Sequence, residues 1–521
     1  MKGHPKGLIA AALSNMGERF GYYIMNAVLT LFLCSKFGLA GGAASGIYSA
    51  FYCGIYILSL VGGLIADRTQ NYKGTIQKGL LIMATGYVLL SIPILATSEN
   101  HTWLLGLTGL ALFLIAFGNG LFKGNLQAIV GQMYDNFEAE AAKQGPEALA
   151  LAKSKRDPGF QIFYMFINVG GLIAPFVAPL LRQWWLGVND MAYNADLPEL
   201  CHQYLGSAAA MAPEAMTKLT GLIEKVNLSG APIAIENYGA FCQEYLNVFN
   251  TGVHYSFIAS VAAMLISLTI FITNKKKFPT PAKKVAQESV QYTAEEKMAM
   301  AKELKQRIAA LFAVLVIAVF FWWSFHQNGA SMALFAKDFV NSDKLAPEIW
   351  QAINPFFVIV LTFPIMWMFG TSWGRKISTP RKIGIGMGVA AIAYIIMTIF
   401  SHQHGFPSAS EFKANVDAQK VHWWILIVFY FFMTVAELFI SPLGLSFVSK
   451  VAPKNLLGLC QGLWLGATAV GNGLLFLGPL MYDSYPIERC WAVFAAVCLI
   501  SMIVMFCMVK WLERVTADNS K

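Results

Sequence analysis

Five ionisable side chains interrupt long apolar stretches of this sequence: Glu18, Arg19, Lys123, His326 and Glu437. A charged side chain at the centre of a membrane-spanning helix costs about 2.5–3.5 kcal/mol, so it is retained mainly where it faces a water-filled path or a partner. Each of these residues is therefore a candidate for binding a charged solute or for carrying a proton.

The first apolar stretch carries a polar and aromatic stripe. Steps of three and four residues place most of its members on one face of a helix, which we expect to line a central cavity. A simpler alternative is that Glu18 and Arg19 only neutralise each other near the cytoplasmic end of that helix. The residues of the stripe, and those beside it, are Asn15, Glu18, Arg19, Tyr22, Tyr23 and Asn26.

Further polar groups share helical faces in later stretches. A lone histidine such as His326 is more often a hydrogen-bonded structural residue than a reactive one. Cations in the first half of the chain and an acid in the second, within aromatic walls, nevertheless suit a zwitterion such as a short peptide. The groups on these faces are Asn119 with Lys123 and Gln127, Trp322 with His326 and Gly329, and Glu437 with Ser441; the surrounding aromatic residues are Tyr22, Tyr23, Tyr56, Trp322 and Trp464.

Transmembrane helices must position these residues. The chain of 521 residues is 56% apolar and 13% charged, which is more apolar surface than a soluble fold needs. Its apolar runs are long enough to cross a hydrocarbon core about 30 Å thick. We predict an all-α membrane protein with about twelve spanning helices, at residues 7–35, 43–66, 76–97, 103–134, 158–182, 248–273, 308–337, 347–370, 383–401, 422–449, 455–482 and 488–510.

A polar, lysine-rich linker at 274–307 divides these spans into two groups of six. This is the layout of the major facilitator fold. We predict an N-terminal six-helix bundle at 1–273 and a C-terminal six-helix bundle at 308–521. The N-terminal bundle includes a long outward loop at 183–247, to which the sequence assigns no role.

The linker also carries a helix signal. Thr293 and Glu296 match a capping box ahead of a charged run at 295–307. We expect this run to form an amphipathic helix on the cytoplasmic face.

Basic residues gather in segments that face the cytoplasm if Met1 does. Because basic residues are retained on that side during insertion, we expect both termini of this inner-membrane protein to be cytoplasmic. The net charge of +9 then follows from topology and gives no reason to expect nucleic acid as a partner. The basic groups after the sixth and eighth spans are Lys275, Lys276, Lys277, Lys283 and Lys284, and Arg375, Lys376, Arg381 and Lys382.

Cys201 and Cys242 both lie in the outward loop. An oxidising compartment there would permit a disulfide between them. Sequence alone leaves the pairing open.

Six segments resemble motifs of the proton-dependent oligopeptide transporter (POT) family, and they extend over both halves of the chain. Residues 160–172 are similar to a family signature at nearly every position, whereas Gly124 stands where the family usually has proline. The segments are 18–23 (ERFGYY), 62–75 (GGLIADRTQNYKGT), 122–125 (FKGN), 160–172 (FQIFYMFINVGGL), 354–356 (NPF) and 437–444 (ELFISPLG).

The resemblance implies roles for individual residues. Lys123 and the first-span charges resemble groups that lie near the peptide carboxylate, and Glu437 resembles the acid that binds the amino terminus. Glu18 and Arg19 resemble the part of the first-span motif that is tied to proton coupling. The positions that resemble pocket-lining residues of the family are Tyr22, Tyr23, Tyr56, Asn168, Asn354 and Trp464.

Three positions depart from the family pattern. Asn15 stands where a glutamate is usual, and Asn26 and His326 replace a basic residue and an acid that can form an outward gate pair. Joint loss of the two charges makes physical sense, because either one alone would be uncompensated in a poorly hydrated site. We hypothesise that Asn26 and His326 form a neutral hydrogen bond whose strength depends on pH, so that His326 carries part of the proton coupling.

The sequence thus predicts a secondary active transporter that imports di- and tripeptides by proton symport through alternating access. An uncoupled peptide facilitator remains open, because two acids usual in the family are absent, as does a carrier of another small amine-bearing or anionic solute. The sequence contains no zinc-protease, nucleophile-elbow or phosphate-loop motif. We therefore expect no enzyme and no cofactor beyond the coupling proton, and we expect a monomer in the lipid bilayer.

Overall fold

The computed structural model describes residues 4–97, 99–279, 294–341, 346–415, 418–451 and 457–517. These residues are helical apart from turns, loops and two isolated bridges. In this part of the chain, 11 segments are long and apolar enough to cross a membrane. The remaining predicted span falls on α3 (Tyr72–Ser91), whose 20 residues extend over about 30 Å. The predicted all-α membrane fold is confirmed.

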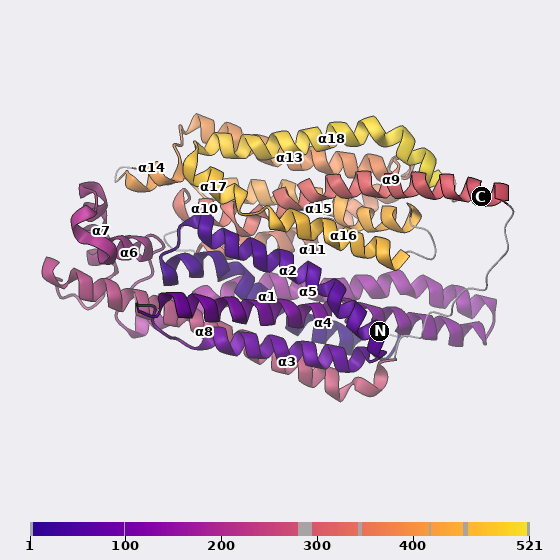
Figure 1. Cartoon of the computed structure of the whole chain (residues 1–521), viewed down its shortest axis with the longest axis horizontal. Helices are drawn as coiled ribbons and strands as arrows, with labels where there is room; N and C mark the ends of the chain where they lie inside the picture. Colours follow the sequence, from indigo (N-terminus) through magenta and orange to yellow (C-terminus); the bar gives the residue numbers. More distant parts are fainter. Residues whose placement is uncertain are drawn as a thin grey trace.

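Six long helices form the N-terminal bundle. Of these, α1 packs against α5 and α8, α3 packs against α4 and α8, and α2 packs against α4. A Cβ added at Gly62 would lie 2.1 Å from the carbonyl oxygen of Gly120, so α2 and α4 touch backbone to backbone, as small residues allow in membrane helices. In Figure 1 they are α1 (Leu8–Phe37), α2 (Gly41–Thr69), α3, α4 (His101–Ala142), α5 (Pro146–Val188) and α8 (Tyr238–Thr273).

The C-terminal bundle contains two spans that are broken into shorter helices. The seventh span runs through α9, a 3-10 turn η4 and α10, and the eleventh runs through α16 and α17. Within the bundle, α13 packs against α15 and α18, and α9 packs against α16. The elements are α9 (Ala294–Phe325), η4 (His326–Gly329), α10 (Ser331–Asp338), η5 (Pro347–Ala352), α11 (Ile353–Gly370), α12 (Ser372–Lys376), α13 (Thr379–Gln403), α14 (Ala409–Ala414), α15 (Trp424–Val451), α16 (Leu457–Gly473), α17 (Leu477–Ser484) and α18 (Ile487–Ala517).

The two bundles lie side by side and meet along two lines of contact. On one side α2 packs against α16 and α17, and on the other α5 packs against η5 and α11. Both chain termini lie toward one end of the molecule in Figure 1, and the short helices α6, α7 and α14 lie at the opposite end. We call the end with the termini the inner end and the opposite one the outer end.

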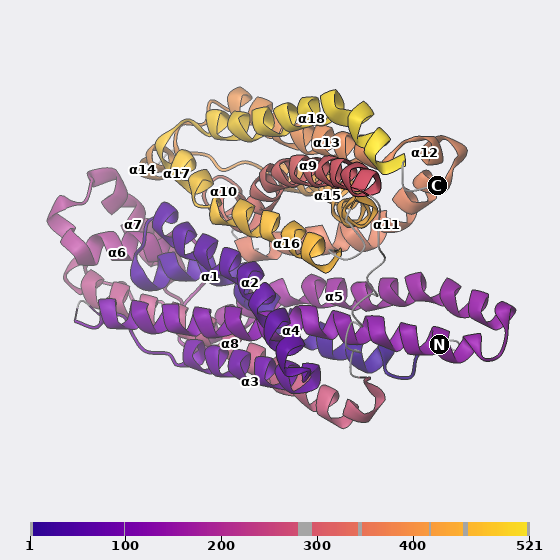
Figure 2. The same cartoon turned by 45° about the vertical axis from the view of Figure 1, so that its right-hand side comes forward.

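Several predicted span boundaries differ from the structure. The third span ends at Ser91 rather than at 97, because Pro93 disfavours helical geometry at the residue before it. The fourth and fifth helices extend to 142 and begin at 146, and Figure 2 shows their hairpin projecting from the inner end. These extensions are polar, so hydropathy does not detect them.

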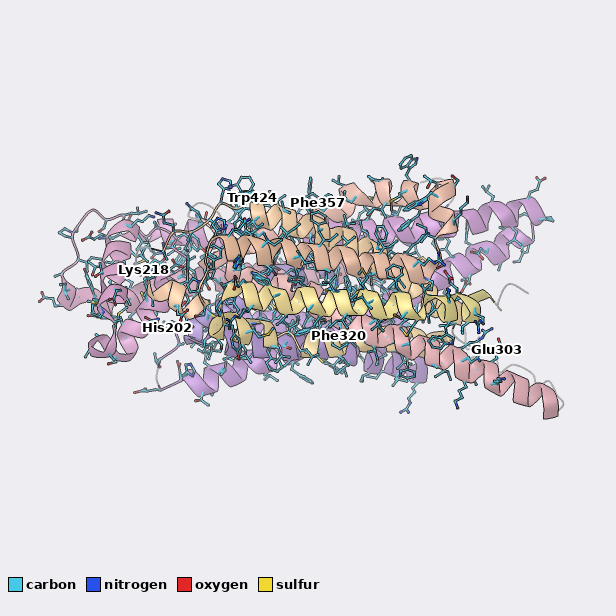
Figure 3. The ribbon with its side chains drawn as sticks, turned by 90° about the horizontal axis from the view of Figure 1, so that it is seen from above. His202, Lys218, Glu303, Phe320, Phe357 and Trp424 are labelled. Atoms are coloured by element: carbon cyan, nitrogen blue, oxygen red, sulfur yellow. The ribbon has the colours of Figure 1, made fainter. Side chains whose placement is uncertain are left out.

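The helix expected at 295–307 is present, but it is the first part of α9 and runs directly into the seventh span. The predicted boundary between linker and C-terminal bundle at 308 thus lies inside a helix. Figure 3 places Glu303, which pairs with Arg307, at the end of the molecule opposite His202. The predicted cap residue Thr293 lies outside the described residues.

The outward loop is partly helical and lies over the outer end. It contains α6 (Leu197–Ser207), the short turns η1 (Ala208–Ala210) and η2 (Ile235–Asn237), and α7 (Pro213–Val226). Met191 and Asn227 form an isolated antiparallel bridge that joins the segment after α5 to the end of α7. The loop is therefore a folded element.

Cys201 and Cys242 are buried, free thiols in this structure. Their side chains lie in contact, and a hydrogen bond with Cys242, together with burial, raises the pKa of the Cys201 thiol. The disulfide is not formed here, and its formation in an oxidising compartment stays a prediction.

Candidate functional site

Glu18 and Arg19 form a buried, bidentate ion pair inside α1. Arg19 Nε donates to Glu18 Oε2 at 2.5 Å, and Arg19 Nη2 donates to Oε1 at 2.7 Å. Asn119 of α4 donates to the same Oε1 at 2.6 Å. The two charges neutralise each other, as the simpler alternative supposed. The Arg19 guanidinium also contacts an aromatic member of the polar stripe, because it lies 4.7 Å from the ring centroid of Tyr22.

Tyrosine rings of α1 and α2 form an aromatic wall beside this pair. The Tyr22 and Tyr23 rings are 5.4 Å apart, and Tyr52 lies 5.9 Å from Tyr56 and 6.5 Å from Tyr22 between ring centroids. Tyr52 was not among the predicted site residues. Its signal was available, since Tyr48, Tyr52 and Tyr56 follow one another at four-residue steps on one helical face.

Lys123 of α4 adds a cation to this wall. Its Nζ lies 4.5 Å from the ring centroid of Tyr56, which is cation–π distance. The charges of Arg19 and Glu18 both act on it. Because Glu18 is already paired with Arg19, Lys123 remains available to an anionic ligand.

Glu437 of α15 supplies the opposite charge from the C-terminal bundle. Asn354 of α11 donates to Glu437 Oε2 at 2.9 Å and to the hydroxyl of Thr434 at 3.0 Å. Glu437 is close enough for its charge to act on Tyr23 and Tyr56 of the facing bundle. The carboxylate thus lies near Tyr56, the tyrosine that Lys123 contacts, across the interface between the bundles.

Asn168 and Trp464 contribute to the two bundles separately. The Asn168 side chain donates to the carbonyl of Tyr164 at 3.2 Å, within the α5 segment that packs on α11. Trp464 is buried, and its ring lies so close to Gly444 that a Cβ there would be 2.0 Å from Cη2. The described contact of Trp464 is therefore packing of α16 on α15.

The hypothesised hydrogen bond between Asn26 and His326 is not formed in this structure. His326 Nδ1 instead lies 2.5 Å from Asn472 Oδ1 of α16, and the Asn26 oxygen accepts from the Tyr22 hydroxyl at 3.2 Å. His326 begins η4, where the seventh span is broken, and this break turns its ring toward α16. Asn472 was missed because nothing in the sequence pairs it with a residue of another span.

His326 still faces the N-terminal bundle. Its ring centroid lies 4.7 Å from that of Tyr52 and 5.0 Å from that of Trp322. Tyr52 in turn lies 5.9 Å from Tyr56, and the Nζ of Lys123 lies 4.5 Å from the Tyr56 ring centroid. The predicted proton-coupling residue and the predicted carboxylate-binding residue therefore contact neighbouring tyrosines of α2.

Ion pairs between α6 and the C-terminal bundle close the outer end. Glu199 accepts from Lys337 and from Lys413, each at 3.1 Å. Asp196 lies 3.1 Å from Lys420. Since Asp196 and Glu199 belong to the outward loop and the three lysines to the other bundle, we call this group the outer latch.

The outer latch lowers the pKa values of its acids. Burial raises the pKa of Glu199, but the ammonium groups of Lys337 and Lys413 outweigh that effect and hold it at about 2. Burial likewise opposes ionisation of Asp196, and Lys420 and Lys218 still lower its pKa. Both carboxylates are ionised at any physiological pH, so the latch does not itself sense a proton gradient.

Chemically, the interface between the bundles offers a cation on one side, a carboxylate on the other and aromatic rings around both. The described residues contain no group of His, Cys, Asp and Glu side chains arranged to hold a metal ion. This arrangement can bind a zwitterion by both ends and can carry a proton.

Two six-helix bundles with ionisable groups at their interface define a membrane carrier of the major facilitator type. The sequence model of the POT family matches residues 73–294 and 280–485, and the chain belongs to that family of peptide transporters.

Relatives of known description support this assignment over most of the chain. The "Peptide transporter YePEPT" of Yersinia enterocolitica is 29% identical over 488 residues, covering 90% of this chain and 86% of the relative. The "Dipeptide and tripeptide permease A" of Escherichia coli is 25% identical over 481 residues, covering 90% and 82%.

Solved structures show the same fold. A peptide transporter POT in complex with sulfate superposes with a TM-score of 0.71 at 21% identity, covering 99% of this chain and 96% of that one. A POT family transporter in complex with 5-aminolevulinic acid gives a TM-score of 0.70 at 17% identity, with 98% of each chain covered.

Proposed function

We propose that this carrier imports di- and tripeptides by proton symport through alternating access. The observation that supports this most directly is the pair of opposite charges across the bundle interface, Lys123 and Glu437, which both lie near Tyr56. Every short peptide carries one terminal ammonium and one terminal carboxylate, whatever its side chains are. Aromatic walls can accept these varied side chains.

Each charge has a defined role in this proposal. Glu437, oriented by Asn354, accepts hydrogen bonds from the peptide amino terminus. Lys123 binds the peptide carboxylate. Arg19 is held by Glu18 and assists electrostatically from the same side.

The link between Lys123 and His326 suggests how proton and peptide are coupled. Neighbouring like charges disfavour each other, and Lys123 and His326 contact adjacent tyrosines of α2. A bound carboxylate neutralises Lys123, removes this repulsion and favours the protonated imidazole. Proton binding and peptide binding thereby assist each other, which is the requirement for symport.

Alternating access requires the outer latch to open and close. In the conformation observed, the latch holds the outer ends of the two bundles together. Outward opening must break these ion pairs, and the bundles then rock about the interfaces of α2 with α16 and of α5 with α11.

The proposal also includes the location, the oligomeric state and the orientation of the protein. It acts as a monomeric carrier in the inner membrane, with both termini cytoplasmic, and it performs no enzymatic reaction. Lys275, Lys276 and Lys277 between the bundles support that orientation. The proton is the coupling ion, and no other cofactor is needed.

An uncoupled facilitator is the second candidate. It is favoured by the Glu18–Arg19–Asn119 network, in which both oxygens of the first-span carboxylate already accept hydrogen bonds. A carrier of another amine-bearing solute is the third, since one POT relative binds 5-aminolevulinic acid.

Uptake of a labelled dipeptide into proteoliposomes separates these candidates. With an inward proton gradient, symport predicts accumulation above the external concentration and its collapse on addition of a protonophore. Equilibration without accumulation would instead establish the facilitator. Absence of uptake by folded protein would refute peptide transport, and competition with 5-aminolevulinic acid would then test the third candidate.

A further inference from the structure

A polar cavity lies at the outer end of the N-terminal bundle, away from the Lys123–Glu437 interface. Its volume is about 560 Å³. It is open on one side and is lined by the end of α1, residues 93–97, the start of α4, α6 and α8. Figure 3 shows His202 of this cavity at the same end as Lys218 of α7. The polar residues that matter to the argument are Lys36, His101, His202, Gln243, Asn250 and His254.

Lys36 is a buried cation without a counter-charge. Its side chain is 5% exposed, and its Nζ lies 2.7 Å from Nε2 of His254. Among the described residues, no carboxylate pairs with Lys36. A buried charge is normally paired, and the C-terminal dipole of α1 offsets only part of the cost at this position.

His254 cannot supply the missing negative charge. Its Nδ1 bonds to the carbonyl of Leu90, so the ring proton sits on Nδ1 and the lone pair of Nε2 faces the ammonium of Lys36. The imidazole is a neutral acceptor in this arrangement. Two of the three ammonium protons of Lys36 remain for another ligand.

Two more histidines surround the same end of α1. His202 Nε2 donates to the carbonyl of Ser35 at 2.7 Å, and His101 Nε2 donates to that of Phe37 at 3.1 Å. Burial lowers the pKa of His202, so it is neutral when the cavity holds no anion. Because the carbonyls of Ser35 and Phe37 already accept hydrogen bonds from these histidines, they are less available to accept one from the ammonium of Lys36.

The rest of the lining is also suited to a negative ligand. None of the described residues that line the cavity is Asp or Glu, and the lining includes amide and hydroxyl donors from α8 and α4. The N-terminus of α4 lies at its wall, and Asn100 makes no side-chain cap to that helix. A long helix whose first N–H groups lack a side-chain cap favours anions at its N-terminus.

We propose that this cavity binds an oxyanion of phosphate type through Lys36 and the N-terminal end of α4. The ligand is either a free anion of the outer medium or the phosphate of a lipid headgroup, since both present the same oxygens. Binding does not depend on peptide transport, because the cavity shares no residue with the proposed peptide site.

Thermal unfolding of the purified protein in nanodiscs of neutral lipid tests the free-anion source. Inorganic phosphate, titrated at constant ionic strength against chloride, is expected to raise the melting temperature saturably. Lys36→Gln should weaken this response at least tenfold, and Lys36→Arg should retain it. Lys78→Gln, which removes an exposed lysine of α3 outside the cavity, is the matched control and should behave as the wild type.

Native mass spectrometry after reconstitution with phosphatidylglycerol tests the lipid source. Retained lipid that is lost in Lys36→Gln, with no response to free phosphate, assigns the site to a headgroup. His202→Gln serves as a second variant if Lys36→Gln does not fold. The proposal would be overturned if the protein showed no saturable response to phosphate and retained no lipid. It would also be overturned if either effect persisted unchanged in a folded Lys36→Gln variant.

Discussion

Glu199 of the outward loop and Lys413 of the C-terminal bundle form an ion pair of 3.1 Å. Glu199 holds Lys337 at the same distance, so one carboxylate from the N-terminal half joins two elements of the other half. A long loop without an evident sequence motif thereby becomes part of the machinery that closes the outer end. The gate that the sequence suggested at Asn26 and His326 makes its bonds to other partners.

Removing the Glu199 charge should favour outward opening. Partly exposed ion pairs contribute up to about 1 kcal/mol each, so loss of both pairs in Glu199→Gln is expected to shift the opening equilibrium by up to about thirtyfold. Cys34 lines the cavity that also contains Glu199 and Lys337. Its labelling by a membrane-impermeant maleimide, quantified by peptide mass spectrometry, should therefore be faster in the variant.

Glu214→Gln is the matched control for this experiment. Glu214 lies on α7 of the same loop and is exposed, so its loss should leave the labelling rate of Cys34 unchanged. Equal rates in wild type and Glu199→Gln would show that the outer latch does not hold the bundles closed.

The latch should weaken only in strong acid. Burial opposes ionisation of Glu199, but Lys337 and Lys413 depress its pKa from 4.5 to about 2. A depressed folded-state pKa gives a contribution that is complete above the unfolded value and is lost as pH falls through the folded one. The difference in melting temperature between wild type and Glu199→Gln should stay constant from pH 8 to about 5 and shrink between about 4.5 and 2.

A difference that changes between pH 8 and 6 would contradict this assignment. It would mean that another titrating group, and not the carboxylate of Glu199, controls the latch. If the difference in melting temperature between wild type and Glu199→Gln is constant from pH 8 to 6, we assign the pH dependence of transport to groups at the bundle interface.

Much of the fold could be predicted from the sequence, because the membrane imposes strong rules. Long apolar runs in a membrane protein of this kind form helices, because backbone groups in lipid must bond within the segment. Because a charge inside the membrane is costly, Glu18, Lys123 and Glu437 could be identified as candidate site residues from the sequence. The structure brings these groups together from α1, α4 and α15.

The outer latch could not be predicted in the same way. Asp196 and Glu199 lie in a polar loop, where acids are usually solvated, and their partners Lys420 and Lys337 are 224 and 138 residues away. The partner of His326 was also hidden, because the break of the seventh span at η4 leaves no mark in hydropathy. Such pairings depend on tertiary placement rather than on local pattern.

Glu437 should determine recognition of the peptide amino terminus. Hydrogen bonds to charged groups contribute about 1.5–3 kcal/mol, so Glu437→Gln is expected to weaken apparent affinity for a dipeptide about 10- to 100-fold. Wild type should discriminate against the N-acetylated peptide, and the variant should lose that discrimination. The exposed residue Glu236 provides the control variant Glu236→Gln; retained discrimination in Glu437→Gln would exclude the assigned role.

Lys123 should determine recognition of the other end. Lys123→Gln is expected to weaken binding of a free-carboxylate dipeptide by a similar factor, with little effect on its C-terminal amide. Lys78→Gln removes an exposed lysine of α3 and should change neither affinity. An equal loss for both peptides would show that Lys123 supports the site structurally without contacting the carboxylate.

Proton uptake on peptide binding should depend on His326. Lys123 and His326 contact adjacent tyrosines of α2, so neutralisation of Lys123 by a peptide carboxylate should favour the protonated form of His326. A weakly buffered solution of purified protein, mixed with dipeptide in the presence of a pH indicator, should become more alkaline. The C-terminal amide should produce no such change.

His326→Gln should abolish this proton uptake and flatten the pH profile of transport, while His402→Gln, which alters an exposed histidine paired with Glu488, should preserve both. An unchanged profile in His326→Gln would assign coupling to another group. The Glu18–Arg19–Asn119 network would then be the remaining candidate, because it contains the carboxylate whose charge acts on Lys123. Proton uptake that persists with the amidated peptide would separate protonation from carboxylate binding and refute the proposed link between Lys123 and His326.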